Sequence, residues 1–334
     1  MNKKKIVNQI LEPHRNSKPK EKCTIFAPSD IALCKYWGKR NSELNLPLTS
    51  SLSISLGNLG STTTLSFCER NDEIILNNNT LASNSEFVIR AKKFLDLFRP
   101  TPKTFFKVDT HNNIPTAAGL ASSASGFASL VLALDDLFQY QLSTPELSIL
   151  ARLGSGSACR SLWQGFVEWD KGTRDDGMDS FAKPIDIIWP ELCVGLLIVE
   201  SGPKKISSRE AMQRTVETSA LYKQWPTQVE HDLALIKQAI QIKNFELLGS
   251  TAEQNAIAMH ATMLDAHPAI DYSTAETLRI REQVQQCRHE GIPVYFTQDA
   301  GPNLKLLFEK KNQNKIQCIF KTTELIKPFE NHIF

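Results

Sequence analysis

The sequence of 334 residues lacks several features that would assign it to a membrane, secreted or nucleic-acid-binding class. No stretch approaches the roughly 18 consecutive apolar residues that a transmembrane helix needs. The apolar part of the N-terminal segment, residues 6–11, is too short and too polar for the core of a signal peptide. Charge of one sign is also missing, since 38 Lys and Arg face 36 Asp and Glu. A net charge of +2 favours neither nucleic acid nor a membrane surface as partner, and we expect a cytoplasmic protein.

Metal-binding and disulfide patterns are absent as well. The seven cysteines are odd in number, widely spaced and contain no CxxC pair, which excludes a disulfide framework and is typical of free thiols in a reducing compartment. The histidines form no HxxxH or HExxH pattern, so we expect no metal site built from protein ligands. The chain also lacks the Gly, four residues, Gly-Lys-Ser/Thr motif and is therefore not a P-loop protein.

What the sequence does contain predicts an α+β protein with a short lead-in and two domains. Hydrophobic residues make up 41% and charged residues 22%, as in an average globular protein. Residues 1–22 hold seven basic and two acidic groups and two prolines, and we expect a flexible basic lead-in. Residues 23–190 mix strand and helix patterns. The continuous apolar run 193–199 is expected to open a second domain over residues 191–334.

Individual elements follow from the spacing of the apolar residues. Ser143, Pro145 and Glu146 form a capping box that predicts a helix start. We expect strands at residues 24–27, 51–56, 62–67, 73–76, 103–108, 165–169, 193–199, 293–297 and 304–308. We expect further helices at residues 86–98, 208–222, 226–260 with a break, and 273–290, the last capped by Ser273.

A loop of small residues, 112–124, precedes an apolar helix and is the first candidate for chemistry. Backbone N–H groups at a helix N-terminus attract anions, Gly119 allows close approach, and Ser122 and Ser123 offer hydroxyl donors. The loop therefore suits phosphate, although the same composition also makes an ordinary tight turn.

Three further clusters are candidates, each with a plainer alternative. The Gly/Ser loop 154–158 leads to Arg160, which can hold a carboxylate or phosphate or be merely solvated. Residues 35–40 interleave three cations with two aromatic rings, as an anion site or a cation–π surface patch does. Asp299 lies in a Gly/Pro turn between two predicted strands, where it either bonds its own backbone or acts as a base facing the phosphate loops.

Taken together, these clusters resemble the motifs of the mevalonate diphosphate decarboxylase family. The matching segments occur in the same order from about residue 23 to 310, nearly the whole chain, and do not cover the lead-in 1–22. They are residues 27–39, 47–53, 112–124, 154–169, 208–212 and 299–303.

This resemblance implies a fold and a reaction. The family belongs to the superfamily of galactokinase, homoserine kinase, mevalonate kinase and phosphomevalonate kinase. It implies an N-terminal domain like domain 2 of ribosomal protein S5, a C-terminal ferredoxin-like domain and an active site in the cleft between them. The implied reaction converts mevalonate 5-diphosphate and ATP to isopentenyl diphosphate, CO₂, ADP and phosphate, with Mg²⁺ accompanying ATP. A homodimer is also implied.

The resemblance further implies roles for single residues. Asp299 orients or deprotonates the C3 hydroxyl, Lys35 supplies positive charge beside it, and Arg160 holds the C1 carboxylate. Gly119, Ser122 and Ser123 hold the ATP phosphates, and no metal ligand is named because Mg²⁺ is usually held through phosphates and water. The residues implied for the substrate, mainly its diphosphate, are Tyr36, Lys39, Ser155, Ser157, Ser208, Arg209 and Met212.

One position departs from the family pattern. Asp30 stands where the family usually has Asn, beside the expected place of the substrate carboxylate. An ionised Asp30 repels that carboxylate unless it pairs with Arg160 or Lys35.

Three alternatives remain open from the residues alone. A phosphomevalonate decarboxylase is disfavoured by Lys39 and Arg209, which suit a diphosphate, and a C3 kinase by the pairing of Asp299 with Lys35. A non-catalytic regulator that binds ATP or isoprenoid precursors is the alternative of another class, and it has no need of a base such as Asp299.

Overall fold

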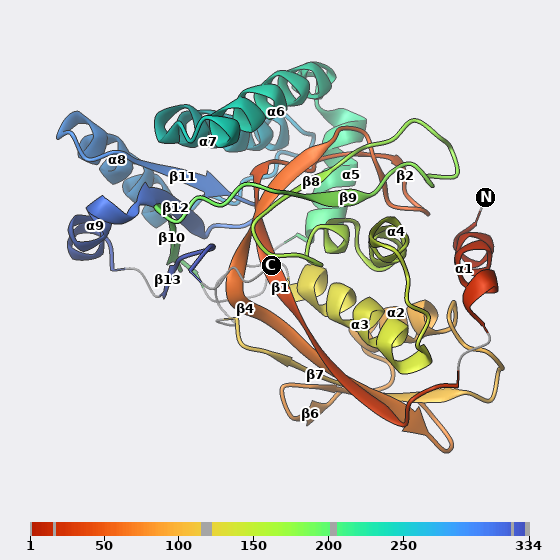
Figure 1. The fold of residues 1–334 in the computed structure, drawn as a ribbon. Helices are drawn as coiled ribbons and strands as arrows, with labels where there is room; N and C mark the ends of the chain where they lie inside the picture. Colours follow the sequence, from red (N-terminus) through yellow and green to blue (C-terminus); the bar gives the residue numbers. More distant parts are fainter. Residues whose placement is uncertain (1, 16–17, 115–121, 201–205, 322–323, 331–334) are drawn as a thin grey trace.

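The computed structural model describes residues 2–15, 18–114, 122–200, 206–321 and 324–330 and has two parts, each built on its own sheet (Figure 1). This arrangement confirms the α+β prediction. The change from one sheet to the other falls between residues 185 and 192, close to the predicted boundary at 190. A two-stranded ribbon, β2 (Lys39–Asn41) and β3 (Leu46–Pro47), lies outside both sheets.

Two long strands organise the N-terminal sheet. β4 pairs with β7 and β8 along its two halves and with β1 on its other side, and every pairing except β5 with β7 is antiparallel. The order is β6-β5-β7-β4-β8-β9, with β1 added to β4. The strands are β1 (Lys22–Cys34), β4 (Ser51–Cys68), β5 (Glu73–Leu76), β6 (Asn79–Thr80), β7 (Phe105–Asn112), β8 (Phe166–Trp169) and β9 (Ala182–Ile185).

The two strands predicted at 51–56 and 62–67 are one strand, β4, which bends at its glycines. Gly57 has φ +59°, and a Cβ on Gly60 would lie 2.1 Å from the Ala27 carbonyl oxygen. Opposite this bend, the register of β1 shifts between Pro28 and Asp30. Such a bulge re-aims the residues that follow it, and the second half of β1 lines the cavity described below.

Helices pack on the N-terminal sheet, and α3 lies along β1 and β4. Buried hydroxyls join α3 to β4: Ser125 Oγ lies 2.7 Å from Ser61 Oγ, and Ser129 Oγ lies 2.7 Å from Thr63 Oγ1. These hydrogen bonds fix where α3 lies along β4, and they therefore fix the position of its N-terminus. The helices are α1 (Lys3–Leu11), α2 (Glu86–Leu95), α3 (Ser122–Phe138) and α4 (Thr144–Gly154), with the predicted capping box of Ser143 and Glu146 at the start of α4.

The C-terminal part carries a four-stranded antiparallel sheet of order β11-β12-β10-β13. Its helices α7 and α8 pack on β11, and the turn between β11 and β12 carries Asp299. The strands are β10 (Leu192–Leu197), β11 (Val294–Gln298), β12 (Leu304–Glu309) and β13 (Glu324–Ile326). The helices are α5 (Ser208–Thr218), α6 (Trp225–Gln241), α7 (Phe245–Leu264), α8 (Ala275–His289) and α9 (Gln313–Ile319).

One hydrophobic core joins the two parts. Ile31 and Leu52 of the N-terminal sheet are fully buried in the same cluster as Val229 of α6 and Leu306 of β12. This shared core holds the end of β1 against the β11–β12 hairpin, so groups on the two parts keep a fixed separation.

The prediction of a flexible lead-in is wrong for residues 3–11. They form α1, whose N-cap Asn2 accepts a hydrogen bond from the Lys5 N–H. Ile6, Val7, Ile10 and Leu11 are buried in the N-terminal core. Their spacing places one apolar face on the body of the protein, and burial of that face outweighs the unfavourable run of lysines.

One helix cap differs from the prediction, and one predicted helix break is confirmed. The cap of α8 is Thr274, which bonds reciprocally with Thr277, so the predicted cap at Ser273 is wrong. The break expected within 226–260 lies at Lys243, whose φ of 50° ends α6 before Asn244 caps α7.

Truncation of a buried α1 side chain tests whether this helix is part of the folded protein. We expect Ile6→Ala to lower the free energy of unfolding by about 2–4 kcal/mol, because it leaves a cavity under α1. The matched control is Ile89→Ala on α2, where the side chain is 42% exposed and the cost should stay below about 0.5 kcal/mol. Urea unfolding measures both values, and equal stabilities of the two variants would show that α1 is not docked.

Candidate active site

A cavity of about 340 Å³ lies where the two parts meet. Its walls come from the end of β1 and the residues after it, the N-terminal ends of α2 and α3, the segment after α4, the start of α5, and the β11–β12 turn. The structure brings most of the predicted site residues into this one cavity: Asp30, Lys35, Tyr36, Lys39, Ser123, Ser155, Ser157, Arg160, Ser208, Arg209, Met212 and Asp299. Gly119 and the side chain of Ser122 lie outside what the structure describes.

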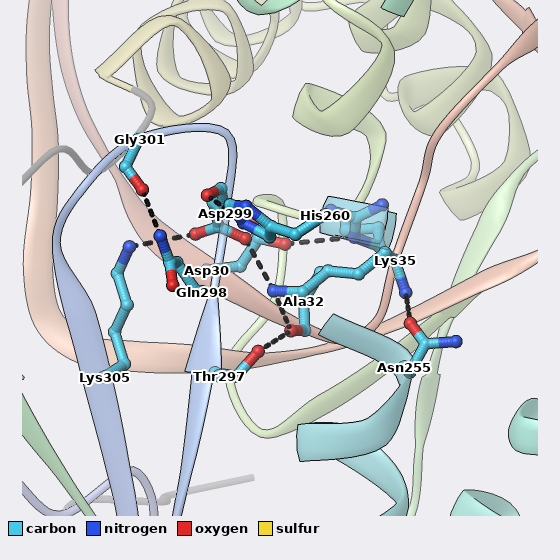
Figure 2. A network of polar contacts seen from close by, with 11 residues as sticks. Asp30, Ala32, Lys35, Asn255, His260, Thr297, Gln298, Asp299, Gly301 and Lys305 are labelled. Carbon is cyan, nitrogen blue, oxygen red and sulfur yellow. Dashed lines mark hydrogen bonds and ion pairs between the residues drawn. The ribbon is translucent and has the colours of Figure 1, made fainter. Parts of the chain in front are cut away.

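The centre of the cavity is a carboxylate held by two ammonium groups. Lys35 Nζ lies 2.8 Å from Asp299 Oδ1, and Lys305 Nζ lies 3.0 Å from Asp299 Oδ2 (Figure 2). Both lysines are only 2% exposed, whereas Asp299 is 32% exposed and faces the cavity. Burial alone raises the pKa of Asp299, but the charges and hydrogen bonds of Lys305 and Lys35 hold it far below its ordinary value.

Lys35 is itself fixed by three contacts. Its ammonium also donates to the Ala32 carbonyl at 2.9 Å, which in turn accepts from Thr297 Oγ1 of β11 at 3.2 Å. Its backbone N–H donates to Asn255 Oδ1 of α7 at 2.8 Å (Figure 2). Burial lowers the pKa of Lys35, and Asp299 opposes this shift. Lys35 and Asp299 therefore each stabilise the charged form of the other.

Two neutral side chains, those of Gln298 and His260, contact the backbone of the Asp299 turn. Gln298 Nε2 donates to the Gly301 carbonyl at 2.7 Å, and His260 Nε2 lies 3.1 Å from the Asp299 carbonyl (Figure 2). Burial lowers the pKa of His260 to about 3, so the ring is neutral and its Nε2–H donates. These contacts hold the backbone of the turn and leave the Asp299 carboxylate to the two lysines.

Arg160 and Asp30 form a buried ion pair at one wall. Arg160 Nε donates to Asp30 Oδ2 at 3.0 Å, and the two side chains are 4% and 3% exposed. Ser161 Oγ donates to the other carboxylate oxygen of Asp30 at 2.8 Å, and Arg160 Nη1 donates to Ser51 Oγ at 2.8 Å. Asp30 thus takes the first of the two pairings considered from the sequence. Its negative charge is compensated by the Arg160 guanidinium.

Another part of the cavity wall, which we call its cationic end, is positively charged. Lys39, Arg90 and Arg209 all line it. Burial, followed by the nearby charges of Arg209, Lys3 and Arg90, lowers the pKa of Lys39 to about 8. This crowding of like charges indicates a place for an anion.

The Gly/Ser loop of residues 154–158, the serine loop, packs against Tyr36. A Cβ on Gly156 would lie 2.8 Å from the Tyr36 hydroxyl oxygen, so the loop approaches this closely only because residue 156 is glycine. The Tyr36 hydroxyl is buried and has no hydrogen-bond partner among the described residues. Its ring packs on Trp169 at a centroid distance of 4.8 Å. The hydroxyl is therefore held in place with its hydrogen-bonding capacity unused.

A second, mainly apolar cavity of about 90 Å³ adjoins the start of α3. Leu76, Val108 and Phe127 line it, and Ser123 lines both this cavity and the larger one. No motif in the sequence indicated this apolar cavity.

Comparison with known proteins assigns the chain to a family. Residues 27–182 match the model of the diphosphomevalonate decarboxylase-like N-terminal domain, and residues 194–331 match that of the mevalonate 5-diphosphate decarboxylase C-terminal domain. The chain belongs to the mevalonate diphosphate decarboxylase family. The two matches fall on either side of the predicted domain boundary.

Named relatives span most of the chain. The diphosphomevalonate decarboxylase of Aspergillus fumigatus is 39% identical over 323 residues, which cover 90% of this chain and 80% of the relative. That of Saccharomyces cerevisiae is 38% identical over 349 residues, covering 93% and 87%.

Solved structures agree with the assignment. Mevalonate diphosphate decarboxylase from Staphylococcus aureus superposes with a TM-score of 0.86 at 37% identity, covering 92% of this chain and 94% of that one. A structure of MDDEF in complex with MVAPP, AMPPCP and magnesium superposes with a TM-score of 0.84 at 43% identity, covering 89% and 92%.

Two residues of this decarboxylase site were missed from sequence. Lys305 is a lone lysine in the apolar strand 304–308, and a charge within a buried strand is a usable signal of a buried partner. His260 lies in the middle of α7 and has no local signal, because its contact with the Asp299 turn is made only by the tertiary fold.

Removal of the second ammonium tests the role of Lys305 in this family member. We expect Lys305→Met to raise the pKa of Asp299 toward its ordinary value of about 4, because one of two stabilising charges is lost. The acid limb of kcat/KM then moves to higher pH, and kcat/KM at neutral pH falls about ten- to hundredfold. Lys107→Met on β7, where the lysine is 46% exposed, is the control for charge loss. Identical pH profiles for both variants and the unmodified enzyme would contradict this role.

Proposed function

We propose that this protein catalyses the ATP-dependent decarboxylation of mevalonate 5-diphosphate to isopentenyl diphosphate, a step of isoprenoid biosynthesis. The observation that carries the proposal is the ionised Asp299 between Lys35 and Lys305 in the cavity of a family member. A charged carboxylate and a net excess of cations suit the transfer of a phosphoryl group to a hydroxyl, which depends on positioning and on charge neutralisation. The assignment of this substrate is supported by relatives that are named diphosphomevalonate decarboxylases.

The substrate lies along the cavity with its diphosphate at the cationic end. Lys39 and Arg209 neutralise the diphosphate, and the Ser155, Ser157 and Tyr36 hydroxyls donate to it. Ser208 and Met212 of α5 lie beside it. The C3 hydroxyl then reaches Asp299.

ATP approaches from the α3 side of the cavity. Gly119, Ser122 and Ser123 hold its phosphates at the positive end of the helix dipole. The adenine ring occupies the apolar cavity beside Phe127, which Ser123 connects to the larger one.

The first step transfers the γ-phosphoryl group. Asp299 accepts a hydrogen bond from the C3 hydroxyl and orients its oxygen for attack on the γ-phosphorus. The new C3–O–P link forms as the bond between the β- and γ-phosphates breaks, ADP leaves, and the hydroxyl proton passes through Asp299 to solvent. Because the pKa of Asp299 is held so low, its main contribution is orientation rather than storage of the proton.

The second step removes phosphate and CO₂. The C3–O bond breaks with its electron pair going to phosphate, and the electrons of the C1–C2 bond form the C2–C3 double bond as CO₂ leaves. Arg160 holds the C1 carboxylate through guanidinium N–H groups other than the Nε–H that it donates to Asp30. Lys35 supplies positive charge to the departing phosphate.

Mg²⁺ is proposed to enter with the phosphates of ATP. Within the described part of the chain, no group of three or more His, Cys, Asp or Glu side chains could hold a metal ion. At nucleotide sites Mg²⁺ is usually held through phosphate oxygens and water. The complex of MDDEF with AMPPCP and magnesium supports the assignment.

We also propose a cytoplasmic location and a homodimeric assembly for the enzyme. No helix in the described ranges is long and apolar enough to cross a membrane. The seven cysteines are free, as is typical of a reducing compartment, and we place the enzyme in the cytoplasm. The homodimer rests on the family resemblance alone.

An assay of both products tests the proposal. We expect purified protein with ATP, Mg²⁺ and mevalonate 5-diphosphate to release ADP and CO₂ in equal amounts. Asp299→Asn should lose both products together, by about 10²–10⁴-fold or more, because the amide neither orients the hydroxyl as a carboxylate does nor balances the two lysines. Asp136→Asn, near the C-terminal end of α3, is the control and should keep full activity.

The other outcomes identify the alternatives. ADP without CO₂ makes the protein a C3 kinase. Turnover only with mevalonate 5-phosphate makes it a phosphomevalonate decarboxylase. Nucleotide binding with no ADP from any mevalonate derivative makes it a regulator.

A further inference from the structure

The first residue of helix α1, Lys3, lies near two of the cations that line the cavity, Lys39 and Arg209. Lys3 Nζ donates to the carbonyl of Leu153, one residue before the end of α4, at 2.6 Å. A cation at this position is favoured by the negative end of the helix dipole. Ser155, Gly156 and Ser157, which line the cavity, follow directly. Lys3 therefore secures the helix end from which the serine loop departs.

A short chain of hydrogen bonds connects Lys3 to Lys39. Asn45 is 2% exposed, and its Nδ2 donates to the carbonyls of Arg152 at 2.9 Å and Leu153 at 3.5 Å. Its Oδ1 accepts from Lys39 Nζ at 2.8 Å. The Leu153 carbonyl and the Asn45 amide thus stand between the two ammonium groups, which belong to segments far apart in the sequence.

The charge in this region is not balanced. The ion pairs within the described ranges include none of the four cations Lys3, Lys39, Arg90 and Arg209. Two carboxylates act on them from further away, Glu43 on Lys3 and Glu86 on Arg90. Burial and neighbouring cations lower the pKa of Lys3 as well as that of Lys39. Lys3, Lys39 and Arg90 are partly buried and Arg209 is exposed. A partly buried cation without an ion-pair partner is stabilised when an anion binds.

We propose that α1 is part of the substrate site and that Lys3 is a positioning residue that raises affinity for the diphosphate group. It does so by adding charge behind Lys39 and by securing the serine loop. Residues 2–11 precede both family-model matches, so this contribution is separate from the motifs that assign the family. The proposal rests on the proposed placement of the diphosphate at Lys39 and Arg209.

A pair of lysines on the same helix makes a matched test. Lys4 Nζ also donates to backbone carbonyls, those of Asp96 and Leu97 just after α2, but its charged neighbours are Arg15, Asp96 and Arg99 rather than Lys39 or Arg209. Lys3→Met and Lys4→Met therefore remove the same charge and the same kind of hydrogen bond from different places. Lys3→Arg restores the charge.

We expect Lys3→Met to raise KM for mevalonate 5-diphosphate and Kd for inorganic diphosphate about three- to fivefold, the effect of one screened charge. The kcat, KM for ATP and the melting temperature should match those of Lys4→Met, and Lys3→Arg should restore both raised constants. Inorganic diphosphate is titrated by calorimetry without Mg²⁺, so that binding is read apart from turnover.

The outcomes separate this inference from the proposed function. Equal constants for Lys3→Met and Lys4→Met in an active decarboxylase overturn the role of Lys3 and leave the function standing. A loss of kcat and melting temperature in Lys3→Met relative to Lys4→Met, with Kd for inorganic diphosphate unchanged, makes Lys3 only a structural cap of α4, which also overturns it. If no variant decarboxylates but Lys3→Met alone weakens inorganic diphosphate binding, the function fails and the inference stands.

Discussion

The site depends on one electrostatic arrangement, a single carboxylate shared by two buried ammonium groups. Lys35 comes from the end of β1, whereas Asp299 and Lys305 come from the β11–β12 hairpin. Removal of Asp299 leaves two uncompensated ammonium groups in a region where both lysines are almost fully buried, whereas removal of one lysine leaves a one-to-one ion pair. The arrangement therefore exists only while the two parts of the molecule are packed together. The shared core around Ile31 and Leu306 maintains that packing.

The cavity around this arrangement has an uneven distribution of charge that matches the proposed substrate. One end gathers Lys39, Arg90 and Arg209 without ion-pair partners in the described ranges, as a diphosphate requires. The wall where the substrate carboxylate is placed carries a neutralised pair, Arg160 with Asp30. Asp30 thus limits the positive charge offered to that carboxylate while it holds the guanidinium in one orientation. In the proposed binding mode, the C3 hydroxyl lies between the two anionic groups of the substrate and donates to Asp299, the one member of the Lys35–Asp299–Lys305 cluster that can accept a hydrogen bond.

Local sequence signals predicted those parts of the molecule that are determined by local structure. The capping box of Ser143 and Glu146 and the strand–turn–strand pattern around Asp299 are confirmed, because each is complete within a few residues. Family motifs singled out most of the residues that line the cavity, although their roles stay predictions.

Features that depend on distant contacts were missed or left open. The docking of α1 was missed because the lysines and prolines of residues 1–22 concealed the short apolar face of Ile6 and Val7. Whether Asp30 meets Arg160 could not be decided from residues 130 positions apart in the chain. Lys305 was overlooked because an apolar strand was interpreted as core alone.

The ionisation state of Asp299 tests the central claim most directly. Carbon-13 NMR of the aspartate side-chain carboxyls, with Asp299→Asn to assign the resonance, follows this one group as pH is lowered. The account predicts that the Asp299 signal stays that of a carboxylate down to the onset of acid unfolding, because both lysines favour the charged form. A titration midpoint at or above the ordinary value of about 4 in the folded protein would contradict it.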